Sequence, residues 1–140
     1  MAHCYHHALS SVRKWGEVIE DYLDLHQWFD QSKSILADPR HRALRHHAEG
    51  IFMLESLFGV TLLNADGKTV PTRLVGEQHV MEDVGFIPSF ADWARLIQPE
   101  RWMLRGHPVD TSPLDPPPAA VGARFPSGFP ASDEPVRVAI

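Results

Sequence analysis

Nine histidines in a chain of 140 residues are the feature of this sequence with the clearest chemical potential. Neutral imidazole is the commonest protein ligand for zinc and other borderline metals, and carboxylates complete such sites. Residues four apart on a helix share one face and can share an ion. This spacing relates His26 to Asp30 and His79 to Asp83. The predicted metal ligands are His7, His26, Asp30, His46, His47, His79 and Asp83.

A metal held by such ligands would suit hydrolysis. Zinc is the first expectation, and manganese or iron is the alternative if carboxylates dominate the site. An acidic residue would act as general base on a water that the ion activates, and the candidates are Glu49, Glu55 and Glu82. The sequence thus predicts a metal-binding domain, and as an enzyme a small metal-dependent hydrolase acting on a phosphorylated or nucleotide substrate.

The spacing of the histidines also has a plainer explanation. Nine histidines and eighteen acidic residues in 140 positions give by chance about one histidine with an acid four residues later, and two are present. The strong zinc signatures His-Glu-x-x-His and paired Cys-x-x-Cys do not occur in the sequence. The histidines could therefore serve only to tie helices together through hydrogen bonds.

Residues 40–47 form a basic cluster in a protein whose net charge is −5. Guanidinium groups bind phosphate through paired donors, so Arg42 and Arg45 are candidates for contacting a phosphate-containing small molecule. The alternative is a solvated face with salt bridges to Asp21, Asp30, Asp38 or Glu49. The acidic overall charge argues against binding to duplex nucleic acid.

The elements that must position these residues are mostly helical. Apolar residues recur at helical spacing in 5–15, 22–36, 76–84 and 88–97, and the pattern of 60–75 around Asp66-Gly67 predicts a β-hairpin. A further helix is expected to run unbroken from Pro39 to about Phe58. The fold class is therefore mainly α: a compact bundle of four to five short helices with one hairpin.

Two adjacent histidines on that long helix provide a geometric test of the metal site. His46 and His47 would point about 100° apart in a straight helix, and His47 would face inward with the aliphatic residues. We expect at least one of them to lie within direct or metal-bridged reach of a histidine or acid from a different helix.

The chain changes character after the helical domain, which we place at residues 1–105. Eight of the twelve prolines lie between His107 and Pro135, so residues 106–140 are expected to form an irregular tail. No apolar run reaches the ~20 residues of a membrane span, and the first residues lack the apolar core of a signal peptide. With its single cysteine, Cys4, the protein is expected in the cytoplasm.

Three blocks of the sequence carry a resemblance to a known family. They are HHALSSVRKWG at 6–16, RHRALRHHAEGIF at 40–52 and GEQHV at 76–80. With these blocks the chain resembles, from Met1 to about Met103, a family of uncharacterised small proteins of bacteria and their phages. The resemblance implies a context and no particular activity. The alternative to the metal-dependent hydrolase is that the chain is a non-enzymatic phage or prophage protein that captures a host protein or a nucleotide signal.

Overall fold

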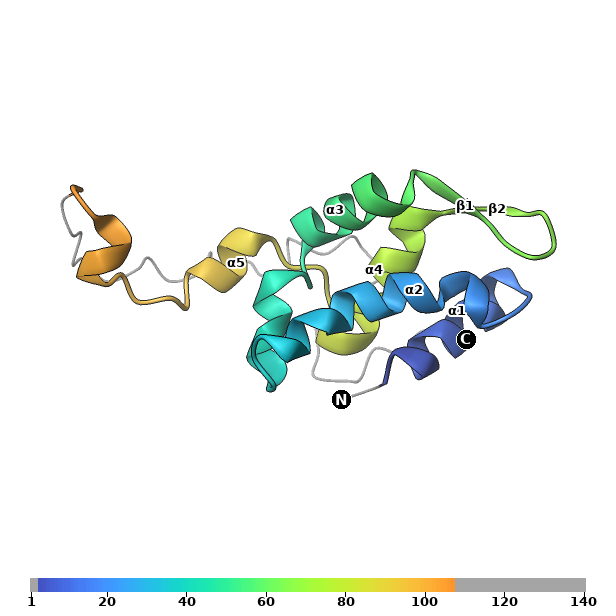
Figure 1. Ribbon diagram of the computed structural model, residues 1–140, viewed down its shortest axis with the longest axis horizontal. Helices are drawn as coiled ribbons and strands as arrows, with labels where there is room; N and C mark the ends of the chain where they lie inside the picture. Colours follow the sequence, from blue (N-terminus) through green and yellow to red (C-terminus); the bar gives the residue numbers. More distant parts are fainter. Residues whose placement is uncertain (1–2, 108–140) are drawn as a thin grey trace.

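The computed structural model describes residues 3–107, and four α-helices form the body of this part. They are α1 (Cys4–Trp15), α2 (Glu20–Asp30), α3 (Ala48–Phe58) and α4 (Thr72–Val84) (Figure 1). The shorter elements are η1 (Gln31–Ser34), η2 (Pro39–Leu44), β1 (Thr61–Leu63), β2 (Thr69–Pro71), α5 (Phe90–Ala94) and η3 (Arg101–Leu104). The expected mainly helical fold with one hairpin is confirmed. Of the predicted tail, residues 108–140 lie outside the described residues.

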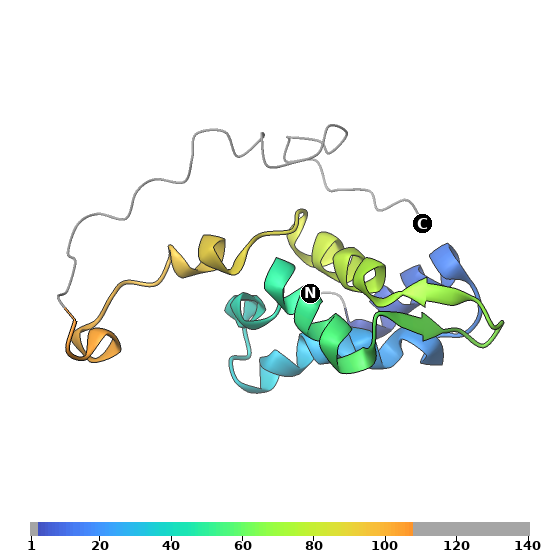
Figure 2. The same ribbon diagram turned by 90° about the horizontal axis from the view of Figure 1, so that it is seen from above.

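The core lies between the helices, with α1 packed along α2 and α3 packed along α4 (Figures 1 and 2). Burial of large apolar side chains is the main stabilising contribution to such a small domain. The fully buried apolar side chains come from all four helices and from β2, and they include Tyr22, Phe29, Leu54, Val70, Val75 and Val80. Within the described residues, no helix is both long and apolar enough to cross a membrane.

The hairpin pairs β1 with β2 in antiparallel register, with Leu62 opposite Val70. Its turn is held by Asn64, whose side-chain oxygen accepts hydrogen bonds from the backbone N–H groups of Asp66 and Lys68. The expected second strand is too long: it ends at Pro71, and residues 72–75 already form the first turn of α4. Proline has no N–H to continue the strand pairing, so the chain can turn into a helix directly after it.

The prediction of one unbroken helix from Pro39 to Phe58 is wrong. The chain forms the 3-10 helix η2 up to Leu44, and α3 begins only at Ala48. Between them His47 has an extended backbone, with φ −160° and ψ 172°, and its Nδ1 accepts a hydrogen bond from the N–H of Gly50. His47 is thus the N-cap of α3, and the expected inward position on a helix face is replaced by this role.

Replacing His47 by alanine should lower the free energy of unfolding by about 1 kcal/mol, because one buried N–H at the start of α3 loses its acceptor. His47→Asn supplies a side-chain oxygen at the same position and should recover most of this loss. Urea denaturation of the two variants measures the difference. Equal losses in both variants would contradict the capping role.

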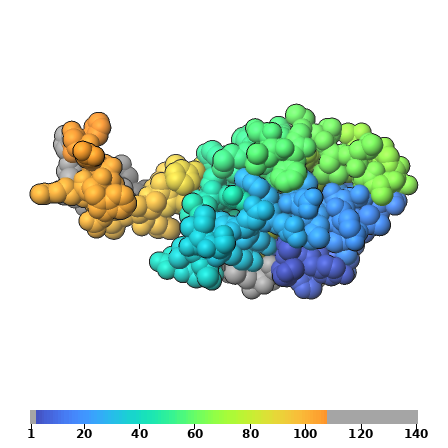
Figure 3. All heavy atoms as spheres, in the orientation of Figure 1, coloured from blue at the N-terminus to red at the C-terminus, as the bar shows by residue number. Residues whose placement is uncertain are grey.

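A short arm follows the helical body and carries α5 and η3 (Figure 3). The arm is hydrogen-bonded at three points to the turn before α3 and to the first two residues of α3. The N–H of Ala48 donates to the carbonyl of Pro88, the N–H of Phe90 donates to Glu49, and the indole N–H of Trp93 donates to the carbonyl of His46 at 3.0 Å. These bonds fix the backbone on which the His46 side chain depends.

Candidate metal site

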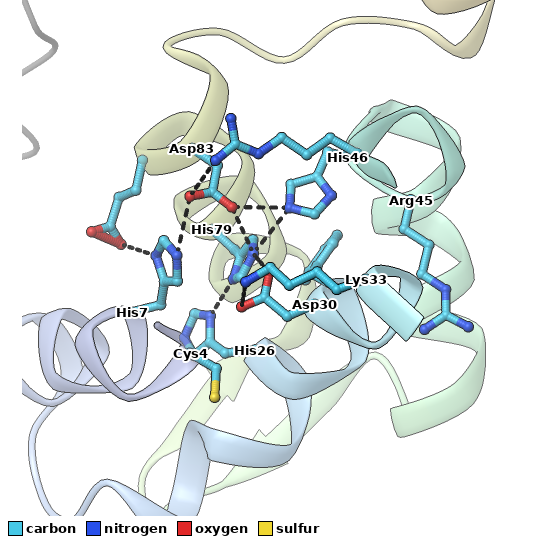
Figure 4. A network of polar contacts seen from close by, with 12 residues as sticks. Cys4, His7, His26, Asp30, Lys33, Arg45, His46, His79 and Asp83 are labelled. Carbon is cyan, nitrogen blue, oxygen red and sulfur yellow. Dashed lines mark hydrogen bonds and ion pairs between the residues drawn. The ribbon is translucent and has the colours of Figure 1, made fainter. Parts of the chain in front are cut away.

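Four side chains converge in the interior at the place where α2, α4 and the turn before α3 meet (Figure 4). Each offers one donor atom, and these atoms all lie within 4.8 Å of one another. We call this group the His/Asp cluster; its members are Asp30, His46, His79 and Asp83. It is a group that could hold a metal ion.

The cluster depends on one regular spacing and two helix ends. His79 and Asp83 are four residues apart on α4, so they share a face, and Asp30 is the last residue of α2. His46 enters from the break between η2 and α3. The expectation that His46 or His47 meets a histidine or acid of another helix is confirmed for His46.

The distances within the cluster match the edges of a small coordination polyhedron. The Nε2 atoms of His46 and His79 are 3.2 Å apart, and Oδ2 of Asp83 lies 3.0 Å from the first and 3.3 Å from the second. Oδ1 of Asp30 is 3.6 Å from Nε2 of His79. Zinc–ligand bonds of 2.0–2.1 Å in a tetrahedron give edges of about 3.3 Å. Three of the four donors therefore already stand at zinc spacing, and Asp30 is the loosest.

Burial and charge suit the cluster to a cation. Both histidines are fully buried, and the Asp83 side chain is 3% exposed. Burial lowers the pKa of His46 to about 4, so its imidazole is neutral and can act as a ligand at pH 7. Burial alone would raise the pKa of Asp83, but His46, His7 and His79 hold it far below its usual range. The cluster thus presents ionised carboxylates and a neutral imidazole.

Behind Asp83 lie two cationic groups that orient its carboxylate. Nε2 of His7 is 3.2 Å from Oδ1 of Asp83, and Nη2 of Arg42 is 3.5 Å from the same atom. Burial would lower the pKa of His7, but the carboxylates of Asp83 and Glu82 outweigh it and raise this pKa to about 9. His7 is therefore a cation at neutral pH and supports the cluster through Asp83.

His26 contacts the cluster from the other side. Its Nδ1 is 2.9 Å from Nδ1 of His79, and its Nε2 is 2.7 Å from the hydroxyl of Ser11. Burial, together with the neighbouring His79 and His7, holds the pKa of His26 well below its ordinary value. His26 is a neutral hydrogen-bonding partner of His79. Its hydrogen bonds tie α2 to α1 and α4, as the plainer explanation of the histidines expects, and they do so next to the candidate metal site.

Several predicted site residues lie elsewhere. Arg45 points away from the cluster (Figure 4): it stacks on the Trp28 ring, 4.4 Å from its centre, and donates to the Trp28 carbonyl. Glu49 accepts from the N–H of Phe90, and Glu55 makes no side-chain hydrogen bond or ion pair within residues 3–107. Of the three proposed bases only Glu82 is nearby, paired with His7 at 3.6 Å and bonded to Gln78.

Sequence reasoning missed the polar residues that support the cluster. Ser11 lies four residues after His7 on the inner face of α1, and Gln78 lies four residues before Glu82 on α4. A spacing of four places Ser11 beside His7 and Gln78 beside Glu82, on helix faces that also carry buried residues. Polar side chains on such faces need hydrogen-bond partners, and this signal could have identified Ser11 and Gln78. A third addition is Lys33, whose Nζ is 3.6 Å from Oδ2 of Asp30.

One family model matches residues 2–103, and its description is domain of unknown function DUF6915. The match covers most of the chain, so the chain belongs to this family. No curated protein and no solved structure matches the chain.

Proposed function

We propose that this DUF6915 protein binds one divalent metal ion at the His/Asp cluster, with zinc as the first expectation. The observation that carries the proposal is the spacing of the Nε2 atoms of His46 and His79 and Oδ2 of Asp83, at 3.0–3.3 Å from one another. Two carboxylates balance the charge of a divalent ion. The donor atoms of the cluster carry lone pairs that repel one another at these distances. A cation or shared protons between the donor atoms would remove this repulsion.

We further propose that the bound ion serves hydrolysis of a phosphorylated small molecule. His46, His79 and Asp83 would be the permanent ligands, a set of two histidines and a carboxylate that leaves a position open, as in catalytic zinc sites. The ion would lower the pKa of a water molecule toward neutrality. Asp30, at the loosest position of the cluster, would orient that water.

Two cationic side chains favour a phosphate group as the target. Arg42 and Lys33 contact Asp83 and Asp30 only through long ion pairs of 3.5 and 3.6 Å. The buried Nε of Arg42 has no hydrogen-bond acceptor within residues 3–107, so the guanidinium is not fully committed to partners beside the cluster. Their side chains are 17% and 30% exposed, more than any member of the cluster. Both could therefore contact phosphate oxygens arriving from solvent.

Metal content tests the first proposal. Protein without an affinity tag, stripped with a chelator and titrated with zinc, should bind one ion per chain, and bound zinc should raise the unfolding temperature. His6→Ala, which removes an exposed histidine of α1, is the matched control and should bind zinc like the unmodified protein. A folded protein that takes up neither zinc, manganese nor iron(II) would refute the metal site.

Hydrolysis is tested separately on the zinc-loaded protein. Chromogenic phosphate monoesters and diesters and the common nucleotides should include a substrate whose turnover stops when a chelator removes the ion. Arg42→Gln should weaken binding of that substrate, while saturating zinc still gives one bound ion per chain. Full zinc loading without turnover of any of these esters would refute the hydrolase and leave a structural metal ion.

A further inference from the structure

Three side chains outside the His/Asp cluster form an unbroken, buried hydrogen-bond chain that ends at His79. Gln78, Ser11 and His26 are all at most 3% exposed. Ser11 Oγ lies 2.9 Å from Oε1 of Gln78 and 2.7 Å from Nε2 of His26. Nδ1 of His26 is 2.9 Å from Nδ1 of His79, whose other ring nitrogen faces the cluster (Figure 4).

The direction of the chain is set at Gln78. Its Nε2 donates to the carbonyl of His7 at 3.0 Å and to the carboxylate of Glu82. The carbonyl of His7 has no proton and can only accept, so the nitrogen of the Gln78 amide must face it. The amide orientation of Gln78 is therefore determined, and its oxygen faces Ser11.

The hydrogen bonds of Ser11 determine which ring nitrogen of His26 carries the proton. The hydroxyl has one proton, and two oxygens compete for it: Oε1 of Gln78 at 2.9 Å and the carbonyl of His7 at 3.2 Å. Neither oxygen has a proton to offer in return. With its own proton committed, Ser11 can only accept from His26, so the proton of the neutral His26 ring is on Nε2.

His26 in turn determines the proton of His79. With Nε2 of His26 protonated, its Nδ1 carries a lone pair and must accept from Nδ1 of His79. With its proton on Nδ1, the neutral form of the His79 ring has its lone pair on Nε2, the atom that meets His46 and Asp83. The opposite tautomer would place a hydrogen at the position of the ion.

We infer that Gln78, Ser11 and His26 are positioning residues that select the metal-binding tautomer of His79 and thereby set the affinity of the cluster for its metal ion. The inference rests on the proposed metal site for its function, whereas the direction of the chain does not depend on a metal. Hydrogen bonds to the far nitrogen of a ligating histidine fix its tautomer and orientation and increase its basicity.

The first test is the tautomer itself in metal-free protein. Long-range proton–nitrogen correlation spectra of histidine-labelled protein in weakly alkaline buffer distinguish Nδ1–H from Nε2–H rings. We expect the His26 proton on Nε2 and a proton on Nδ1 of His79. A His26 ring protonated on Nδ1 would overturn the inference, whether or not zinc binds.

The second test is zinc affinity, measured by competition with a chelator of known affinity. Ser11→Ala should lower the affinity about 10- to 100-fold. Ser32→Ala is the matched control, because Ser32 is also a buried serine hydrogen-bonded to a histidine, at 2.6 Å from Nδ1 of His41, and lies outside the chain. It should leave the affinity unchanged. Equal zinc affinities in the two variants would overturn the inference.

The two tests separate this inference from the metal proposal. Zinc binding with a reversed His26 tautomer refutes the hydrogen-bond chain alone. The expected tautomers in a protein that binds no metal refute the metal site, and with it the effect on affinity, while the direction of the chain is confirmed.

Discussion

We expect the Asp83→Asn variant to lose zinc binding and to be the least stable of the single substitutions in the cluster. Asp83 is the carboxylate on which His46, His79, His7 and Arg42 all converge, at 3.0–3.5 Å. Asparagine keeps the size of the side chain and removes its charge. Loss of one partner from a buried ion pair costs about 3–5 kcal/mol, so the free energy of unfolding of the metal-free protein should fall by that amount.

Zinc titration and urea denaturation measure the two effects separately. The zinc affinity should fall more than about 100-fold, beyond the loss expected for residues that only support a ligand. Asp24→Asn, the same chemical change at an exposed position of α2, should alter neither quantity. If Asp83→Asn does not fold, Asp30→Asn replaces a carboxylate with fewer partners and should weaken zinc binding in a folded protein. Unchanged zinc affinity in Asp83→Asn, or in Asp30→Asn where Asp83→Asn does not fold, would rule out the site.

Gly50→Ala should destabilise the protein by at least about 3 kcal/mol, a large effect for the addition of one methyl group. A Cβ at this position would lie 1.8 Å from the carbonyl oxygen and 2.6 Å from the carbonyl carbon of Arg45. Both atoms belong to the backbone, so α3 or the preceding turn must move. The same turn carries His46, and zinc affinity should therefore fall together with stability.

Gly76→Ala provides the comparison for that substitution. Its Cβ would meet side-chain atoms of Leu54 and Ile51 at 3.1 and 3.2 Å, which can shift slightly, and alanine also favours the helix by about 1 kcal/mol. Thermal and urea denaturation should show a much smaller loss than in Gly50→Ala. Losses of similar size would mean that the turn before α3 is free to move.

Local patterns in the sequence were sufficient for the helices and for half of the cluster. Helical periodicity predicted α1, α2 and α4, although the start of α4 was placed late. His79 and Asp83 are four residues apart on one helix, and their side chains are in contact at 3.3 Å, as this spacing predicted. His26 and Asp30, by contrast, do not join the cluster as a pair: Asp30 is a member, and His26 contacts the other ring nitrogen of His79 from outside it.

The remainder depends on contacts between distant segments. The helix break at 45–47 is held by Arg45 on Trp28 and by the indole of Trp93 on the carbonyl of His46, partners separated by 17 and 47 positions in the chain. Helix propensity alone favours continuation through this stretch. Likewise the function of Gln78 follows only once α1 has brought Ser11 and the carbonyl of His7 against α4.

The hydrogen bond from Trp93 to His46 has a thermodynamic consequence for the arm that carries α5. The indole of Trp93 binds the backbone carbonyl of His46, and the proposed metal ion would bind the imidazole of the same residue. If the cluster holds an ion as proposed, the position of the arm and the occupancy of the cluster are therefore linked. Linkage is reciprocal: any ligand of the arm that shifts the turn must change metal affinity by the same factor by which metal changes the affinity of that ligand. A typical coupling free energy of about 1–3 kcal/mol corresponds to a change in affinity of about 5- to 150-fold.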